Sequence, residues 1–230
     1  MIKIFADGAN LQSLSKHNQD KKISGFTTNP TLMKKAGILD YKKFALDALK
    51  IINNKPISFE VFADEFDAME NQALLISSWS DNINVKIPIT NTKGESSIPL
   101  IERLVKQNVK LNITAVMTID QVRSVSKVLS KNVFSITSVF CGRIADTGID
   151  PITICKESSK ILEDCGSNLL WASPREVLNI FQAEQSGCKI ITLTDELLSK
   201  MKLINKDLNE FSLETVKMFY NDAIDSGFAL

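Results

Sequence analysis

Eight short apolar runs, rich in β-branched and aromatic residues, alternate along the chain with segments of helical periodicity. The predicted strands are residues 2–6, 23–26, 57–62, 83–89, 110–116, 133–140, 168–172 and 188–193. The predicted helices, each with an apolar stripe, are residues 40–52, 66–79, 97–107, 119–129, 152–162 and 176–184. Asp150, Ser173 and Thr118 are the expected helix starts, since the first two precede a proline and the third offers a capping hydroxyl.

Alternating buried strands and helices form either an open doubly wound sheet or a closed barrel. Eight repeats favour a (β/α)8 TIM barrel, an α/β fold that typically takes about 250 residues, so these 230 residues would form a compact one. We predict a single TIM-barrel domain over residues 1–230 with a C-terminal helical extension over residues 209–230. We expect Ser212 to cap that last helix. Its apolar stripe would pack on the barrel or on a neighbouring subunit, and consists of Leu213, Val216, Phe219, Tyr220 and Ala223.

The charge balance excludes several classes of partner. Lys and Arg number 27 and so do Asp and Glu, without a long run of one sign, so we expect neither a nucleic-acid nor a membrane partner. The chain begins directly with a strand pattern and no apolar run reaches spanning length, which predicts a cytoplasmic protein. The four cysteines form no C-x-x-C pair, and the single histidine, His17, is expected at the surface. We therefore predict no metal site, and the lack of a glycine-rich nucleotide motif agrees with our expectation of no cofactor.

Lys86 stands in the middle of the predicted strand 83–89. An ammonium group is costly to remove from water, and a neutral lysine amine is a nucleophile that forms a Schiff base with a carbonyl carbon. The alternative interpretations are that Lys86 reaches solvent from a strand end or pairs with a carboxylate.

Other polar residues favour the catalytic interpretation, because a TIM barrel builds its active site at the C-terminal ends of its strands. Each residue alone fits an ordinary turn or strand position. Together, however, Asp7, Glu60, Lys86, Asn112 and Thr114 would point inward near one end of the barrel. A buried Asp and Glu beside a lysine are costly unless they serve as partners or catalysts.

These residue types fit chemistry on a ketone. Lys86 would attack the carbonyl to give a carbinolamine, and Glu60 with Thr114, acting through a water molecule, would supply the proton transfers of its dehydration to an iminium. The iminium accepts electrons when a neighbouring carbon–carbon bond breaks, once Asp7 has removed a hydroxyl proton. The groups expected to hold the hydroxyls of a polyol are Asn29, Asn112 and Ser138. Those expected to receive an anionic tail are Arg143, Ser173 and Arg175.

Seven stretches make the chain resemble the transaldolases, in particular the small subfamily that includes fructose-6-phosphate aldolase-like enzymes. They are Phe5-Ala6-Asp7, residues 25–31 (GFTTNPT), Glu60, residues 85–88 (VKIP), Asn112-Ile113-Thr114, residues 138–144 (SVFCGRI) and residues 172–175 (ASPR). The T-T-N-P and V-K-I-P pieces are the most specific. Two positions depart from the family's common residues, with Gly8 in place of threonine or serine and Pro174 in place of an apolar or aromatic residue.

The resemblance implies an (α/β)8 barrel, a Schiff base at Lys86, acid and base work by Asp7, and water activation by Glu60 and Thr114. It implies substrate binding by Thr27, Asn29, Asn112, Ser138, Phe140 and Ser173, and phosphate capture by Arg143 and Arg175. The implied substrates are sugar phosphates. A dihydroxyacetone unit would pass from a ketose phosphate, such as fructose 6-phosphate or sedoheptulose 7-phosphate, to an aldose phosphate such as erythrose 4-phosphate, as in the pentose phosphate pathway.

Glu60 and Phe140 are the pair that the resemblance gives to transaldolases, whereas aldolase-type members carry glutamine and tyrosine there. The alternatives are a class I aldolase of the fructose-6-phosphate aldolase type, a transaldolase for a nonstandard sugar such as a sulfonated one, and a sugar-phosphate-binding barrel that has lost catalysis. The resemblance also implies a homo-oligomer, a pentamer or decamer, assembled partly through the C-terminal helix.

Overall fold

The computed structural model describes residues 2–229. Its contacts divide the chain into two compact units, one ending at Leu198 and the other beginning at Ser199, and each is described by itself. No helix within residues 2–229 is long and apolar enough to cross a membrane.

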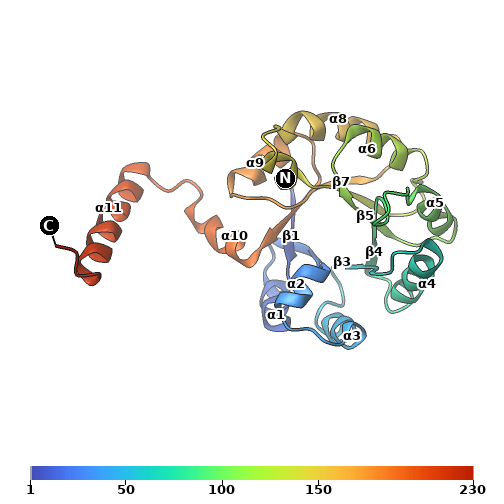
Figure 1. Cartoon of the computed structure of the whole chain (residues 1–230), viewed down its shortest axis with the longest axis horizontal. Helices are drawn as coiled ribbons and strands as arrows, with labels where there is room; N and C mark the ends of the chain where they lie inside the picture. The colour runs from blue at the N-terminus through green and yellow to red at the C-terminus, as the bar shows by residue number, and fades with distance from the viewer. Residues whose placement is uncertain (1, 230) are drawn as a thin grey trace. The chain divides into compact units, whose positions relative to one another are not determined.

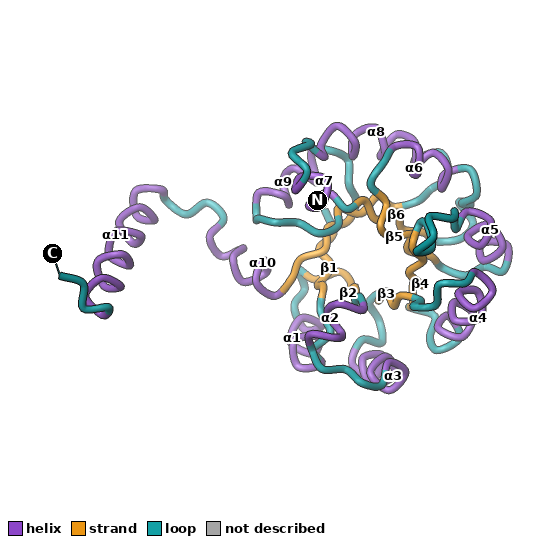
Figure 2. Tube along the Cα trace, in the orientation of Figure 1, coloured by secondary structure: helices purple, strands orange, loops and turns teal. Residues whose placement is uncertain are grey.

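In the first unit, parallel strands close into an eight-stranded barrel in chain order, and β1 pairs with both β2 and β8 (Figures 1 and 2). This confirms the predicted (β/α)8 TIM barrel, and each predicted run overlaps one strand. The strands are β1 (Lys3–Asp7), β2 (Ile23–Thr27), β3 (Ile57–Glu60), β4 (Ile83–Pro88), β5 (Leu111–Val116), β6 (Ser135–Val139), β7 (Asn168–Trp171) and β8 (Ile190–Thr194).

The helices of this unit lie around the outside of the barrel, where their apolar faces cover the strands (Figure 1). They are α1 (Leu11–Gln19), α2 (Pro30–Lys35), α3 (Tyr41–Ile51), α4 (Phe66–Ser77), α5 (Ile98–Lys106), α6 (Ile119–Ser126), α7 (Cys141–Asp146), α8 (Pro151–Glu163) and α9 (Leu178–Gln185), while α10 (Asp195–Lys200) crosses the boundary between the two units. The sequence predicted α3, α4, α5, α6, α8 and α9. It missed α2, α7 and α10, each of which has 6 residues and is too short for a periodic stripe, and it missed α1, which buries Leu14 alone.

Two of the three expected helix starts are confirmed. Asp150 accepts a hydrogen bond from the Ile152 backbone at the start of α8, and Thr118 forms a capping box with Gln121 at the start of α6. The expectation for Ser173 is wrong: its φ is +58°, outside the extended region of an N-cap, and α9 begins at Leu178. A left-handed backbone conformation of this kind is typical of a turn.

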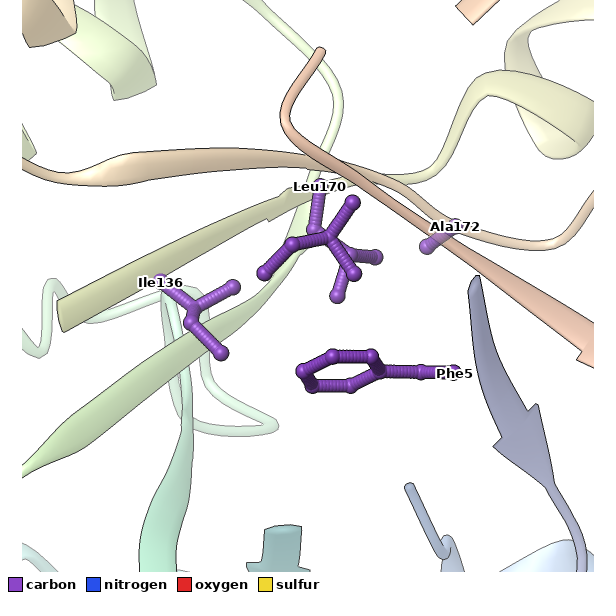
Figure 3. Close-up of a cluster of buried hydrophobic side chains, with 5 residues drawn as sticks. Phe5, Ile136, Leu170 and Ala172 are labelled. Carbon is purple, nitrogen blue, oxygen red and sulfur yellow. The ribbon is translucent and has the colours of Figure 1, made fainter. Parts of the chain in front are cut away.

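An apolar cluster fills the barrel interior beneath the polar strand ends (Figure 3). It consists of Phe5, Ile136, Leu170, Ala172 and Ile190, with Phe140 packed against it. Because side chains alternate along a strand, Phe5 shares the interior face with Asp7, and Ile136 shares it with Ser138. Gly25 makes room for this layer, since a Cβ there would lie 2.6 Å from the Phe5 ring. The cluster gives the polar groups at the strand ends an apolar floor.

The second unit holds a short 3₁₀ helix η1 (Met201–Leu203) and the helix α11 (Leu208–Asp225). The predicted helix is therefore present, but the prediction of Ser212 as its N-cap is wrong. Asp207 caps it by accepting hydrogen bonds from the backbones of Asn209 and Glu210, so the helix begins five residues earlier. No side chain of α11 is buried, and the packing partner of its apolar stripe stays a prediction.

Candidate active site

A cavity of about 510 Å³ opens at the C-terminal ends of the barrel strands. All twelve side chains that the sequence singled out line it. They are Asp7, Thr27, Asn29, Glu60, Lys86, Asn112, Thr114, Ser138, Phe140, Arg143, Ser173 and Arg175. Residues from nearly every strand of the barrel and from the following loops thus meet in one space, because parallel strands all end at the same rim.

Lys86 points from β4 into this cavity and does not reach bulk solvent, since its side chain is 8% exposed. Its Nζ donates a hydrogen bond of 2.9 Å to the Thr28 backbone carbonyl and lies 3.1 Å from Glu60 Oε2. Of the two alternatives to a catalytic lysine, the structure therefore excludes the solvent-seeking one and shows the carboxylate pair. The pair is compatible with catalysis, because a carboxylate at this distance can accept the ammonium proton and leave a nucleophilic amine.

Two interactions of the main chain fix the position of Glu60 on β3. The register of parallel strands sets it opposite Lys86, and the Tyr41 hydroxyl donates a hydrogen bond of 2.6 Å to the Glu60 backbone carbonyl. Burial raises the pKa of the Tyr41 phenol, and the Glu60 carboxylate raises it further, so Tyr41 stays a neutral donor. Tyr41 in turn packs against Phe59 and Phe62, which holds its hydroxyl in place.

Asp7 ends β1 beside this pair, and Thr27 Oγ1 donates a hydrogen bond of 2.8 Å to its Oδ1. Burial raises the pKa of the Asp7 carboxyl above its ordinary value of 3.8. The nearby Lys86 cation and the Thr27 hydrogen bond partly offset this rise, and the Glu60 carboxylate adds to it. A carboxylate with a raised pKa is a stronger base than an exposed one, as proton abstraction from a hydroxyl requires.

Thr114 has a buried Oγ1 without a hydrogen-bond partner among residues 2–229. The residue after it, Ala115, has a φ of +60°, and the β5–β6 register shifts between Ile113 and Val116. Bulges of this kind re-aim side chains near active sites. Here the Thr114 hydroxyl is left as a free donor and acceptor at the cavity wall.

A chain of hydrogen bonds crosses the barrel interior through Asn112, which is fully buried. Ser138 Oγ donates to Asn112 Oδ1 at 2.7 Å, and Asn112 Nδ2 donates to Ser58 Oγ at 3.1 Å. Both partners fix the orientation of the amide at the cavity floor. Sequence reasoning did not single out Ser58, although its position two residues before Glu60 on β3 indicated an inward side chain.

Two arginines also line the cavity. Arg143 is on α7, and Arg175 follows β7 after the turn at Ser173. A Cβ on Gly142 would lie 1.6 Å from the Ser173 carbonyl oxygen, so only glycine lets this turn approach α7. Arg143 forms no ion pair within residues 2–229, whereas Arg175 is paired with Asp146, which the sequence did not single out.

The remaining wall of the cavity is formed by residues that sequence reasoning gave no role, and they are Pro30, Thr31, Leu32, Ala115, Leu170, Ala172, Pro174, Thr192 and Thr194. Within the described residues, no group of three or more His, Cys, Asp or Glu side chains could hold a metal ion. His17, expected at the surface, lies on α1 outside the cavity, where its side chain is only 14% exposed and its Nε2 is 2.7 Å from Asp195 Oδ1.

Fold and site together define a TIM barrel with a buried lysine–carboxylate pair in a polar cavity at the C-terminal ends of its strands, the place where enzymes of this fold carry out their chemistry. The chain matches the family described as transaldolase/fructose-6-phosphate aldolase over residues 4–229, and it belongs to that family of enzymes.

The names of curated relatives agree with this family membership. A "Probable transaldolase" of Dehalococcoides mccartyi is 32% identical over 202 residues, which cover 87% of this chain and 90% of the relative. A "Probable transaldolase" of Streptococcus pyogenes is 30% identical with the same coverage, 87% and 90%. A solved structure titled "Native KDPGal structure" superposes with a TM-score of 0.52 at 9% identity, covering 84% of this chain and 81% of that one. That likeness concerns the fold alone.

Proposed function

We propose that this protein is a transaldolase that transfers a dihydroxyacetone unit between sugar phosphates through a Schiff base on Lys86. The observation that carries the proposal is the position of the Lys86 amine, 3.1 Å from Glu60 Oε2 in a cavity that Asp7 also lines. The names of the curated relatives support the same activity.

The reaction begins with proton transfer from Lys86 to Glu60 and attack of the free amine on the ketone of the donor. The carbinolamine loses water with the help of Glu60 and the Thr114 hydroxyl and becomes an iminium. Asp7 then takes the proton of the hydroxyl on the far carbon, the carbon–carbon bond breaks, and an aldose leaves. The electron pair passes to the iminium, which becomes an enamine on Lys86. The enamine attacks the acceptor aldehyde, Asp7 returns its proton to the new alkoxide, and hydrolysis of the iminium releases the new ketose and restores the lysine.

The binding residues suit such a substrate. The Asn112 amide is fixed by Ser138 and Ser58, and with Asn29 and Thr27 it would bind the hydroxyls of the dihydroxyacetone unit. Phe140 offers an apolar surface beside the carbon chain. Arg143, Arg175 and the Ser173 hydroxyl would bind the phosphate tail, since guanidinium groups match phosphate geometry.

Borohydride trapping with fructose 6-phosphate tests the Schiff base. Reduction followed by peptide mass mapping should place a dihydroxyacetone-sized adduct on Lys86, and Lys86→Ala should abolish it. An adduct on another lysine would refute the mechanism at this site, and no adduct together with no turnover would favour a binding barrel without catalysis.

A class I aldolase of the fructose-6-phosphate aldolase type is the second candidate, because the family model covers both activities. Assays of fructose 6-phosphate with and without erythrose 4-phosphate separate the two. A transaldolase releases little product until the acceptor is added, whereas an aldolase cleaves the donor alone. Glu60 and Phe140 favour transfer. A sulfonate-tailed sugar would use the same donor chemistry, and a comparison of phosphate-tailed and sulfonate-tailed acceptors tests that alternative.

We further propose that the protein is a cytoplasmic homo-oligomer, a pentamer or decamer, in which the apolar stripe of α11 packs on another subunit. The exposed stripe supports the proposal: Val216, Phe219 and Tyr220 are 60%, 63% and 66% exposed. Light scattering on the full chain measures the mass directly. A monomer would refute this assembly without affecting the proposed chemistry.

A further inference from the structure

Asp146 holds the Arg175 guanidinium in a two-point hydrogen bond beside the cavity that Arg175 lines. Its Oδ1 accepts from Arg175 Nε at 3.1 Å, and its Oδ2 accepts from Nη2. Asp146 is the last residue of α7, one turn beyond Arg143. Arg175 lines the cavity and Asp146 does not. The carboxylate therefore contacts Arg175 without itself lining the cavity.

We propose that Asp146 is a positioning residue that orients Arg175 toward the anionic tail of the substrate, an inference that rests on the function proposed above. A guanidinium carries five N–H donors, and Asp146 uses the Nε donor and one on Nη2. Both Nη1 hydrogens and the second Nη2 hydrogen are left, and two of these donors form the adjacent Nη1–Nη2 edge. That edge can bind two oxygens of a phosphate group at once.

The main chain of Arg175 is fixed as well. Its backbone N–H donates a hydrogen bond of 2.7 Å to Asn179 Oδ1, which also accepts from the Glu176 backbone. The preceding turn at Ser173 is held against Gly142 of α7. With both ends restrained, Arg175 loses little side-chain freedom when an anion binds, and preorganisation of this kind increases affinity.

A contribution to folding stability does not explain the presence of the Arg175–Asp146 ion pair. The Arg175 and Asp146 side chains are 50% and 54% exposed, and pairs this accessible contribute little to folding. The negative charge also weakens the long-range attraction for an anion. We expect the gain from orienting Arg175 to exceed this weakened attraction, because recognition of phosphate by arginine depends on short, directed hydrogen bonds. The two effects predict opposite changes in KM when Asp146 is neutralised.

The experiment compares Asp146→Asn, Asp146→Ala and Asp146→Glu in the full chain. The matched control is Glu157→Gln, because the Arg123–Glu157 pair between α6 and α8 is similarly accessible, at 54% and 45%, and does not line the cavity. With a saturating donor, KM is measured for a phosphorylated acceptor, erythrose 4-phosphate, and for unphosphorylated glyceraldehyde.

We expect Asp146→Ala to raise KM for the phosphorylated acceptor by about fivefold or more, with kcat within about twofold and KM for glyceraldehyde unchanged. Asp146→Glu should restore part of the loss, and Glu157→Gln should change nothing. The double variant Asp146→Ala/Arg175→Ala should bind no more weakly than Arg175→Ala, because Asp146 acts through Arg175. An unchanged or lower KM in both Asp146→Asn and Asp146→Ala would overturn the proposal, as would equal losses for both acceptors.

Titration calorimetry with inorganic phosphate separates this inference from the proposed function. If the wild-type protein does not turn over sugar phosphates but binds phosphate, and Asp146→Ala weakens that binding about fivefold, the function fails and the positioning role stands. If sugar phosphates are turned over and phosphate binding is the same in all variants, the positioning role fails alone. If the wild-type protein neither binds phosphate nor turns over sugar phosphates, both are refuted.

Discussion

Lys86 and Glu60 are opposite one another on adjacent parallel strands, and their charged groups lie 3.1 Å apart in the barrel interior. The β3–β4 register alone sets this pairing, so no loop movement is needed to bring the base to the amine. Pairs held on strands are more rigid than pairs held on loops. The relationship also explains how a lysine tolerates burial, since removing either partner would leave an uncompensated charge.

Glu60→Gln tests whether Glu60 accepts the lysine proton. Glutamine has nearly the same shape but cannot take up a proton, so Schiff-base formation should slow by about 10²–10⁴-fold, as expected for loss of a general base. The rate of borohydride trapping and kcat measure this. Glu70→Gln is the matched control: Glu70 also pairs with a basic residue, Arg103, and its side chain is 19% exposed against 18% for Glu60. Equal trapping rates in wild type and Glu60→Gln would contradict the role.

Asp7→Asn should abolish activity and yet raise the stability of the folded protein at neutral pH. The folded-state pKa of Asp7 is raised above 3.8, so the folded protein holds this proton more tightly than the unfolded chain. Its contribution to stability is therefore fully present below pH 3.8 and is lost as pH rises through the folded pKa. Asparagine avoids that loss and still accepts the Thr27 hydrogen bond. We expect a higher Tm than wild type at neutral pH, a difference that disappears below pH 3.8, and loss of turnover.

Asp64→Asn should change the stability of the folded protein at neutral pH in the opposite direction to Asp7→Asn. Hydrogen bonds from the Thr92 backbone and hydroxyl lower the pKa of Asp64, so its contribution to stability is present above pH 3.8 and is lost as pH falls through the folded pKa. This variant should be less stable than wild type at neutral pH and retain activity.

The pH profile of the wild-type enzyme tests Asp7 directly. Because the pKa of Asp7 is raised, the acid limb of kcat/KM should lie above pH 3.8, and a limb at or below that value would exclude Asp7 as the base.

Long periodic patterns made the barrel predictable from the sequence. The strand Ile83–Pro88 is buried on both faces, and its outer face carries Ile83, Val85 and Ile87, an apolar pattern that survives any detail of packing. The meeting of Asp7, Glu60 and Lys86 followed from the same source, since parallel strands bring their C-terminal ends to one rim.

Features that depend on loop geometry were not predictable in the same way. Asp146 ends the six-residue helix α7 and precedes Arg175 by 29 residues in the sequence. No sequence pattern around Asp146 indicates that the two residues pair. Ser173 was expected to cap a helix, since the residue types of a cap and of a tight turn are the same. Asp207 was missed as the cap of α11 because it and Ser212 are both good N-cap residues, and only the backbone shows where the helix begins.

Gly142→Ala tests the close approach of the Ser173 turn to α7. A Cβ at 1.6 Å from the Ser173 carbonyl forces the turn to move, so we expect a loss of about 1–3 kcal/mol in unfolding free energy and a higher KM for phosphorylated substrates. Gly8→Ala is the control, because a Cβ there meets no atom within 4 Å. It should stay within about 0.5 kcal/mol of wild type. Denaturant titration measures both, and equal stability of the two variants would contradict the steric argument.

Ser138→Ala tests the hydrogen-bonded chain through Asn112. The substitution leaves the fully buried Asn112 Oδ1 without its donor at 2.7 Å, so the unfolding free energy should fall by about 1–3 kcal/mol. Ser135→Ala, on the same strand, removes an equally buried hydroxyl that has no partner among the described residues, and should leave stability unchanged or slightly higher. Both variants are compared by urea denaturation. A loss in Ser135→Ala as large as in Ser138→Ala would show that packing, and not the hydrogen bond to Asn112, accounts for the effect.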